Sequence, residues 1–237
     1  MTKYEEIIAL RQDLKRPSVF HHNKIQFRML MWHITIRSSA FFKRLMDILL
    51  AVAALILGSP FFLITALLVK LTSPGPVIFS QVRVGRFGRH FKFYKFRSMY
   101  IDAEVRKAEL LKLNESGDGV IFKMKKDPRI TPVGRFIRKF SIDELPQLFN
   151  VLLGDMSLVG PRPPLPSEVK TYTLEERKRL NITPGITCLW QVSGRSELPF
   201  SKQIALDKEY IASQSMWKDF LILLRTIPAI LTGKGAW

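Results

Sequence analysis

Two adjacent carboxylates, Asp143 and Glu144, are the residues of this chain whose types and spacing could most directly do chemistry. A carboxylate can attack phosphorus and carry the phosphoryl group as a mixed anhydride. Cationic residues stand on both sides of the pair in the sequence, at Arg129, Arg135, Arg138, Lys139 and Arg162. Because such cations can offset the charge of a phosphate, the pattern fits a carboxylate nucleophile that acts on an anionic phosphate ester.

The segment around the pair indicates an amphipathic helix. Apolar residues recur at helical spacing from Leu145 to Leu152, and Gly154 stands where such a helix would end. The pattern predicts a helix over 141–153 with both carboxylates near its N-terminus, where the dipole favours anions. An alternative is that Ser141 and Glu144 form a capping box, in which Glu144 only satisfies a backbone donor.

Arg162 and Arg195 are further candidates for binding an anionic substrate. Prolines on both sides of Arg162, at Pro161 and Pro163, hold its backbone extended, which suits a positioned phosphate or base contact. The alternative is a rigid connector with a solvent-facing arginine. The tripeptide Ser193-Gly194-Arg195 could bind an anion with its backbone and guanidinium.

Positive charge dominates the composition. The 237 residues include 37 Lys and Arg against 20 Asp and Glu, a formal net charge of +17. Such an excess implies an anionic partner, which is nucleic acid, a phosphate-rich ligand or an acidic membrane surface. Cys188 is the only cysteine, which excludes a disulfide framework and a thiolate metal site and fits a reducing compartment.

Basic residues also recur at regular spacing in one part of the chain. From Ile48 through Ile101 there is no acidic residue. Within this window a basic residue stands at every third position from 83 to 95, namely Arg83, Arg86, Arg89, Lys92 and Lys95, and Arg97 follows. A solvated basic face is the commoner meaning of such a run. Because the run follows an apolar segment typical of membranes, we interpret it as docking to lipid headgroups or phosphate ligands, with Arg97 among the substrate-binding candidates.

The apolar segment itself, Ile48 to Val69, is 22 residues long and uncharged. That length reaches the ~20 residues with which a helix spans a bilayer. Ser59-Pro60 lies at its middle, where Pro60 should kink the helix and Ser59 can hydrogen-bond the carbonyl that the proline leaves free. Each half is then about ten residues or ~15 Å long, half of the ~30 Å hydrocarbon core.

Both flanks of this segment are basic, with Lys43 and Arg44 before it and Lys70 after it. The positive-inside rule therefore places both ends on the cytoplasmic side. A re-entrant helix, broken at Ser59-Pro60, would enter and leave the same leaflet and satisfies the pattern. A kinked spanning helix and a buried core helix are the alternatives.

We accordingly predict an α/β, mostly helical fold in three parts. Residues 1–40 form a helical approach segment, residues 41–72 form the re-entrant membrane helix, and residues 73–237 form a small cytosolic catalytic domain. The apolar stretch from Trp217 to Leu231 is too short to span a bilayer and predicts an amphipathic helix in the membrane interface.

Within the third part, the sequence predicts several short elements. Strands are expected at Val77 to Phe79 and at Phe91 to Phe96, where aromatic and β-branched residues gather. Helices are expected from residue 102 to about Leu113 and from Thr131-Pro132 onward, because Pro132 suits a first helical turn.

Eight motifs follow one another through residues 41–237: Lys43-Arg44-Leu45-Met46-Asp47, Ser59-Pro60, Ser73-Pro74-Gly75-Pro76-Val77-Ile78-Phe79, Tyr94-Lys95-Phe96-Arg97-Ser98-Met99, Ser141-Ile142-Asp143-Glu144-Leu145-Pro146-Gln147, Gly154-Asp155-Met156-Ser157-Leu158-Val159-Gly160-Pro161-Arg162-Pro163, Pro184-Gly185-Ile186-Thr187 and Trp190-Gln191-Val192-Ser193-Gly194-Arg195. In this order they resemble the bacterial sugar transferase family, the monotopic polyprenyl-phosphate phosphoglycosyl transferases.

The resemblance implies transfer of a sugar-1-phosphate from a UDP-sugar to undecaprenyl phosphate with release of UMP. Such a reaction is the first membrane step of exopolysaccharide, capsule, O-antigen or glycoprotein glycan assembly. The resemblance further implies Asp143 as the nucleophile that forms a covalent phosphosugar-aspartate, with Glu144 as its catalytic partner. Mg²⁺ beside these two carboxylates would offset the diphosphate charge, and Lys95, Arg138 and Arg162 would contact phosphate or nucleotide.

The implied location is the cytoplasmic face of the bacterial inner membrane, with no nucleic-acid partner and with homo-oligomerisation left open. Two other classes remain as alternatives. A non-catalytic basic membrane tether for anionic lipid or nucleic acid explains the charge but not the carboxylate pair, and no nucleic-acid module is recognisable. A polytopic lipid phosphotransferase would need several spanning helices, where we expect one anchor. The sequence does not specify the sugar.

Overall fold

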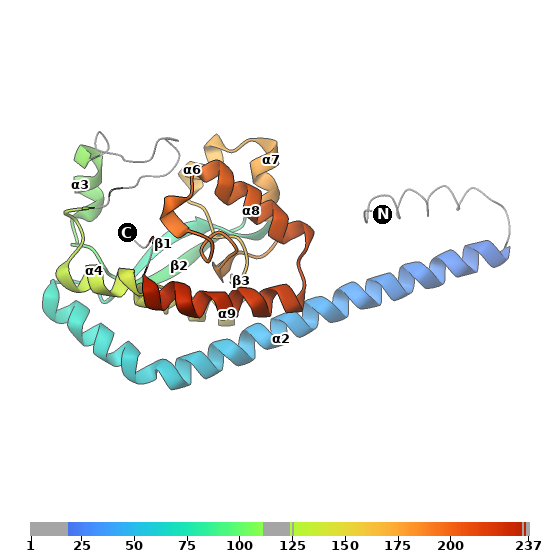
Figure 1. The fold of residues 1–237 in the computed structure, drawn as a ribbon, viewed down its shortest axis with the longest axis horizontal. Helices are drawn as coiled ribbons and strands as arrows, with labels where there is room; N and C mark the ends of the chain where they lie inside the picture. Colours follow the sequence, from blue (N-terminus) through green and yellow to red (C-terminus); the bar gives the residue numbers. More distant parts are fainter. Residues whose placement is uncertain (1–18, 111–123, 125, 234, 236–237) are drawn as a thin grey trace. The chain divides into compact units, whose positions relative to one another are not determined.

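The computed structural model describes residues 19–110, 124, 126–233 and 235 (Figure 1). The chain divides into two units, residues 1–46 and residues 47–237. Helix α2 (Val19–Thr72) begins in the first unit, so the predicted approach segment is helical from Val19 onward. Residues 1–18 of that prediction lie outside the described part of the chain.

The apolar part of α2 opens the second unit. Pro60 lies inside α2, and the ribbon changes direction between residues 50 and 75 (Figure 1). Ser59 Oγ donates to the carbonyl of Ile56 at 2.9 Å, which is the carbonyl that a residue with an N–H at position 60 would pair with. The predicted hydrogen bond of Ser59 is therefore confirmed. Because that bond satisfies the freed carbonyl, the helix remains helical through Ser59-Pro60 rather than dividing into two helices.

The outer surface of this helix is apolar and exposed. Among the described residues, one helical segment, Ser38–Thr72, is long and apolar enough to cross a membrane by its length and composition, and only 11% of its most apolar window is buried. Leu57, Leu63 and Leu71 are each more than two-thirds exposed. A core helix of a soluble domain would bury these side chains, so the buried-helix alternative is excluded.

Strands β1 (Ile78–Val84) and β2 (His90–Phe96) form an antiparallel hairpin around the short 3₁₀ turn η1 (Arg86–Gly88). Both predicted strands are confirmed, and the first extends further than predicted. Alternation along β2 places Phe91, Phe93 and Lys95 on one face. The two phenylalanines are buried there, so Lys95 projects from the rim of a packed surface.

The hairpin divides the regularly spaced basic residues, which we expected to act as one docking cluster. Arg83 and Lys95 lie on the face that lines the cleft described below. Arg86, Arg89 and Lys92 are exposed at the turn or on the opposite face. A spacing of three does not match the two-residue period of a strand, so the run is divided between two faces. Its docking to lipid headgroups or phosphate ligands stays a prediction.

A second sheet pairs β3 (Ser157–Val159) with β4 (Gly185–Thr187) in parallel. The backbones meet closely just beyond β3, where a Cβ on Gly185 would lie 2.1 Å from the nitrogen of Gly160. Only glycine at this position permits that approach. The chain between the two strands forms α6 (Pro166–Thr171), α7 (Leu174–Arg177) and η4 (Lys178–Asn181).

The remaining elements surround these small sheets, so the fold is mostly helical as predicted. They are α3 (Ala103–Leu110), α4 (Pro132–Lys139), η3 (Ile142–Glu144), α5 (Gln147–Leu153), η5 (Arg195–Glu197), α8 (Phe200–Ala212) and α9 (Met216–Thr232). Helix α4 begins at the predicted Pro132, with Thr131 Oγ1 accepting from the Gly134 amide at 2.9 Å. The predicted end of the helix from residue 102, about Leu113, lies outside the described residues, which are interrupted after Leu110.

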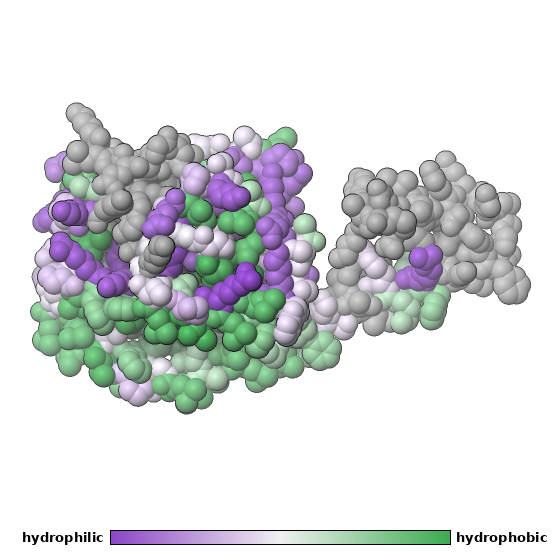
Figure 2. Space-filling model, in the orientation of Figure 1, coloured by the Kyte–Doolittle hydropathy of each residue, from purple (hydrophilic) through white to green (hydrophobic). Residues whose placement is uncertain are grey.

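Helix α9 confirms the amphipathic helix predicted at Trp217 to Leu231. Ile222 is buried in the main core with Phe93, whereas Trp217 and Ile227 are more than half exposed. Apolar side chains form a continuous band along the edge of the second unit (Figure 2). Such a band is larger than isolated exposed residues would make, which supports contact with a membrane surface.

Candidate active site

The turn that carries Asp143 and Glu144 differs from the predicted helix start. The two carboxylates lie in η3, which is separate from α5, and the left-handed Ser141 (φ 55°) makes no side-chain capping bond. Pro146 has no N–H to give to the Ile142 carbonyl, so that carbonyl accepts from Leu145 at 3.2 Å in a 3₁₀ pattern instead. The predicted helix over 141–153 and the capping-box alternative are therefore both wrong, although Gly154 does end α5 with a left-handed φ of 89°.

A polar residue inside α5 fixes this turn against the hairpin. The fully buried Asn150 donates from Nδ2 to the Lys92 carbonyl at 2.6 Å, and its Oδ1 accepts from the Tyr94 amide at 3.1 Å. These two bonds bring Lys95 on β2 next to the carboxylates. The sequence analysis missed Asn150, although its signal was available: an asparagine within a helix whose neighbours Leu148 and Val151 are apolar.

Asp47 is a second residue that the sequence analysis missed as a structural contact. Its buried carboxylate accepts from the amide of Leu158 on β3 at 3.1 Å, so the start of the anchor is bonded to the strand that leads to Arg162. The signal was a single acidic residue directly before the apolar run.

Helix α4 brings Arg138 to the same place. A Cβ on Gly134 would lie 1.9 Å from the Ser98 carbonyl, so only glycine lets α4 pack this closely on the end of the hairpin. Arg138, one turn further along α4, is half-buried and lines the cleft. Arg135 and Lys139 are exposed on the outer side of the helix.

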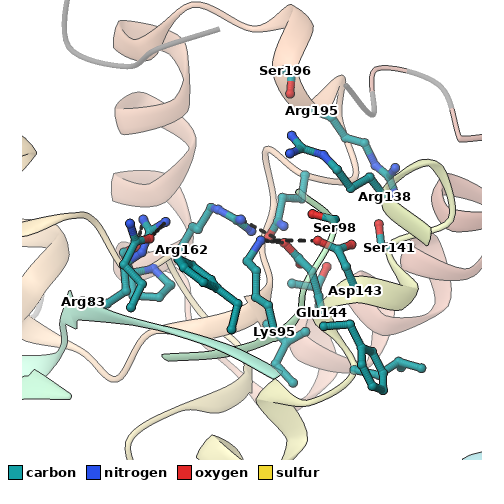
Figure 3. A pocket seen from close by; sticks show the side chains of 18 of the residues that line it. Arg83, Lys95, Ser98, Arg138, Ser141, Asp143, Glu144, Arg162, Arg195 and Ser196 are labelled. Atoms are coloured by element: carbon teal, nitrogen blue, oxygen red, sulfur yellow. Dashed lines mark hydrogen bonds and ion pairs between the residues drawn. The ribbon is translucent and has the colours of Figure 1, made fainter. Parts of the chain in front are cut away.

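The two carboxylates have different partners (Figure 3). Glu144 Oε1 lies 2.8 Å from Arg162 Nη2 and 3.2 Å from Lys95 Nζ. Asp143 Oδ2 has a longer contact, 3.6 Å, with the same Lys95 nitrogen. Glu144 thus points at two cations, whereas Asp143 lies on the side of the cleft that holds Arg138 (Figure 3).

The pKa values of Asp143 and Glu144 are shifted in opposite directions. Burial raises the pKa of Asp143, an effect that Lys95 opposes and the negative charge of Glu144 reinforces. Burial would also raise the pKa of Glu144, but Arg162 and Lys95 bring it well below its usual range. Desolvation in turn lowers the pKa of Lys95, against the attraction of both carboxylates. Glu144 therefore stays ionised at neutral pH, and Asp143 is the carboxylate whose charge is less completely offset.

These groups line a cleft of about 840 Å³. Arg195 reaches it from a turn in which Gly194 and Arg195 both have positive φ, of 147° and 53°. The hydroxyls of Ser98 and Ser141 lie on the same side as Arg138 and Arg195 (Figure 3). Asp143 consequently faces a region of arginines and hydroxyls, which is suited to a phosphorylated ligand.

Two other predicted cations are used elsewhere. Arg129 forms a buried ion pair with Asp127, at 2.6 Å between Nη2 and Oδ2. Arg97 is 6% exposed and donates from Nη2 to the Ser73 carbonyl at 2.6 Å, just beyond the end of α2. It borders the cleft as well, so its substrate contact stays a prediction.

The next question is whether the acidic residues of the cleft could bind a metal ion. Among the described residues, no group of three or more His, Cys, Asp and Glu side chains could hold one. Magnesium is usually bound by one or two carboxylates together with substrate phosphates, so two adjacent carboxylates in a cleft lined by arginines fit that ion. Asp143 fits better than Glu144, whose Oε1 is already shared by two cations.

Comparison with known proteins matches residues 38–233 to the family described as bacterial sugar transferase. The chain is 55% identical over 163 residues to the galactosyl transferase CpsE of Streptococcus agalactiae, covering 68% of this chain and 36% of that protein. It is 43% identical over 227 residues to the undecaprenyl-phosphate galactose phosphotransferase of Salmonella typhimurium, covering 92% and 46%. It is also 38% identical over 198 residues to the exopolysaccharide production protein ExoY of Rhizobium meliloti, covering 82% and 88%. The chain thus spans less than half of the first two relatives.

Proposed function

Because this chain belongs to the bacterial sugar transferase family, we propose that it transfers a sugar-1-phosphate from a UDP-sugar to undecaprenyl phosphate and releases UMP. One observation carries the proposal. Glu144 is paired with Arg162 and Lys95, while the neighbouring Asp143 is buried, less completely offset and directed at a cleft of arginines and hydroxyls. The printed name of the Salmonella relative, an undecaprenyl-phosphate galactose phosphotransferase, supports the lipid acceptor.

In the first step, an oxygen of ionised Asp143 attacks the β-phosphorus of the donor. The bond from that phosphorus to the bridging oxygen breaks, and UMP leaves with the electron pair. Arg138 and Lys95 offset the charge that develops on the phosphate oxygens. The product is a sugar phosphate esterified to Asp143 as a mixed anhydride.

In the second step, a phosphate oxygen of undecaprenyl phosphate attacks the same phosphorus. The bond to Asp143 breaks, and the carboxylate regains its electron pair. One site thereby serves a soluble donor and a membrane-bound acceptor in turn, with the covalent aspartate linking the two half-reactions.

Glu144 acts in this scheme as an ionised residue. Its pKa lies well below the usual range, because Arg162 and Lys95 outweigh its burial, so it holds no proton to donate at neutral pH. Its role is to keep these two cations beside the reacting phosphate. Mg²⁺, when bound by Asp143, Glu144 and the donor, would neutralise diphosphate charge.

The reaction is tested with purified protein in lipid nanodiscs that contain undecaprenyl phosphate. UMP release is measured for UDP-galactose, UDP-glucose and UDP-N-acetylgalactosamine, with Asp143→Asn as the matched control. Without acceptor, intact-protein mass spectrometry should detect one added sugar phosphate, of the mass set by the donor, on the wild type and none on the variant. Binding to anionic vesicles with no UMP from any donor would contradict the proposal and favour a membrane tether.

We further propose that residues 41–72 of α2 are re-entrant, with both ends of this segment on the cytoplasmic side of the inner membrane. The bend in the part that contains Pro60, the basic residues at both ends and the apolar band shared with α9 support this orientation. Single cysteines replacing Ser38 or Thr72 in a Cys188→Ser background should resist a membrane-impermeant thiol reagent in intact cells. Labelling of the residue-38 site would show a spanning helix instead. Pro60→Leu should shift the helix toward spanning and lower activity.

A further inference from the structure

Arg162 lies in a segment that has few backbone N–H groups, so it can donate few hydrogen bonds to the rest of the protein. The residues between β3 and α6 form no regular secondary structure, and prolines at 161, 163 and 164 lack an N–H. Their carbonyls are nevertheless all used. Four consecutive carbonyls accept hydrogen bonds: Pro161 from the Gly185 amide at 3.0 Å, Arg162 from Arg179 Nη2 at 3.2 Å, Pro163 from Arg83 Nη1 at 3.1 Å and Pro164 from the Val84 amide at 3.0 Å.

The bond to the carbonyl of Arg162 itself comes from a side chain that is held on its other sides. Arg179 Nη2 also lies 2.6 Å from Asp207 Oδ2, and Arg179 Nη1 donates to the hydroxyl of Tyr172 at 3.1 Å. Arg179 is 6% exposed and Asp207 is 1% exposed. The guanidinium therefore joins η4 and α8 to the backbone of the residue that pairs with Glu144.

Asp207 offsets the positive charge of Arg179, which lies close to two other arginines. Arg162 belongs to the segment, and Arg83 and Arg179 both donate to its carbonyls. Burial, with the charge of Arg162 as a second cause, lowers the pKa of Arg83 to about 10. Asp207 offsets Arg179, and Glu144 offsets Arg162. With Asp207 in place, Arg179 has its own anion, and Arg162 alone of the three makes an ion pair with Glu144.

We propose that Asp207 and Arg179 form a positioning pair, which holds the backbone of Arg162 so that its guanidinium reaches Glu144. This inference rests on the proposed function of the carboxylate pair. Neither residue is assigned a contact with the reacting atoms, and their effect on the reaction passes through Arg162.

The stability of the pair can be separated from its positioning role. Replacing both members of a buried ion pair by apolar residues of similar size is often neutral for stability, whereas removing one member is strongly destabilising. The double variant Arg179→Met/Asp207→Leu should therefore keep its melting temperature close to that of the wild type. It nevertheless deprives the Arg162 carbonyl of its donor, and kcat should fall about tenfold with KM for the donor little changed.

A double-mutant cycle tests whether the effect passes through Arg162. In an Arg162→Ala background, the double change should cost less than about twofold, because the residue that it positions is gone. In a Lys95→Met background, the tenfold loss should persist. An equal loss in the Arg162→Ala background, or a rise in donor KM that persists there, would show direct substrate binding or a general structural role and overturn the proposal.

Tyr172→Phe is the matched control. It removes one hydrogen bond of Arg179 but leaves the contacts to Asp207 and to the Arg162 carbonyl, so kcat should be unchanged. If the double variant does not fold, Arg179→Lys replaces it. A lysine can still pair with Asp207 but cannot reach the other two acceptors in the fixed geometry of a guanidinium, and the same cycle applies.

Hydrogen exchange gives a readout that does not depend on activity. The amides of Val84 and Gly185 donate to carbonyls of the same segment, and they should exchange faster in the double variant but not in Tyr172→Phe. If the wild type releases no UMP from any donor, the proposed function fails. The exchange rates of these two amides then remain as the test of the positioning role. Faster exchange then supports it, and unchanged exchange overturns it.

Discussion

Two groups of charged residues, one buried and the other buried or half-buried, line the same cleft and differ in how completely their charges are paired. In the first, Arg129 binds both oxygens of Asp127, with Nε 2.9 Å from Oδ1 and Nη2 2.6 Å from Oδ2. In the second, Asp143 and Glu144 share Lys95, and the nearer contacts go to Glu144.

The pKa values follow this difference. Burial alone would raise the pKa of Asp127, but the hydrogen bonds and charge of Arg129 bring it below its usual value. The pKa of Asp143 is raised, because burial and Glu144 outweigh the cations around it. A carboxylate whose two oxygens are both bonded by one arginine has its charge offset and serves a structural role. Two anions that share their cations leave one carboxylate with bonding capacity for a substrate, which is what a nucleophile needs.

The sharpest way to break this comparison is Asp143→Asn. An amide cannot form the phosphosugar anhydride, so UMP release should fall by more than about 10³-fold, while the melting temperature changes little or rises. The measurement is single-turnover UMP release together with thermal unfolding. Substantial release by well-folded Asp143→Asn protein would remove the nucleophile assignment.

Glu144→Gln should have the next largest effect, a loss of roughly 10²-fold in kcat. The neutral amide no longer balances Arg162 and Lys95, so neither cation stays fixed beside the phosphate. Steady-state kinetics with the preferred donor measure the loss. A variant that loses stability but keeps kcat would place Glu144 among structural residues like Asp127.

Asp127→Ala should act on stability and not on chemistry. It leaves Arg129 buried without its carboxylate, at a cost of about 3 kcal/mol, and kcat per folded molecule should stay unchanged. Because the folded-state pKa of Asp127 is lowered, its contribution is complete above the unfolded pKa of ~3.9 and disappears as pH falls through the folded value. The stability difference between wild type and variant should therefore shrink below about pH 4. A kcat that falls while stability is unchanged would mean that Asp127 and Arg129 take part in the reaction and are not only structural.

The smallest effect that we predict is a shift of the pH profile in Arg138→Gln, which comes in addition to the loss of kcat expected when a cation beside the reacting phosphate is removed. The proposed mechanism requires ionised Asp143, so activity should fall on the acid side at a pH above the usual aspartate value of ~3.9. Arg138 lowers the pKa of Asp143, although less than Lys95 does, and its removal should move the acid limb of kcat to higher pH. If the acid limb of the kcat profile does not move, the group that titrates there is not Asp143.

Much of the architecture follows from local sequence. The bend in the anchor follows from Pro60, the start of α4 from Thr131-Pro132, and the hairpin strands from aromatic and β-branched runs. Prediction failed where backbone geometry overrode a pattern. The apolar spacing after Glu144 suggested one helix, but Pro146 withholds the amide that would join η3 to α5.

The sequence by itself determined which residues could do the chemistry: a carboxylate pair, a proline-flanked Arg162 and an excess of cations. Types and local spacing suffice for that, because nucleophilicity and charge are properties of the side chains. Only the tertiary structure decided which carboxylate has its charge less completely offset and which cation pairs with which anion. Lys95 and Arg162 meet Glu144 through contacts over 49 and 18 positions of sequence. Burial raises the pKa of both carboxylates, and these two cations, which lie beside Glu144 only in the folded chain, bring its pKa below that of Asp143.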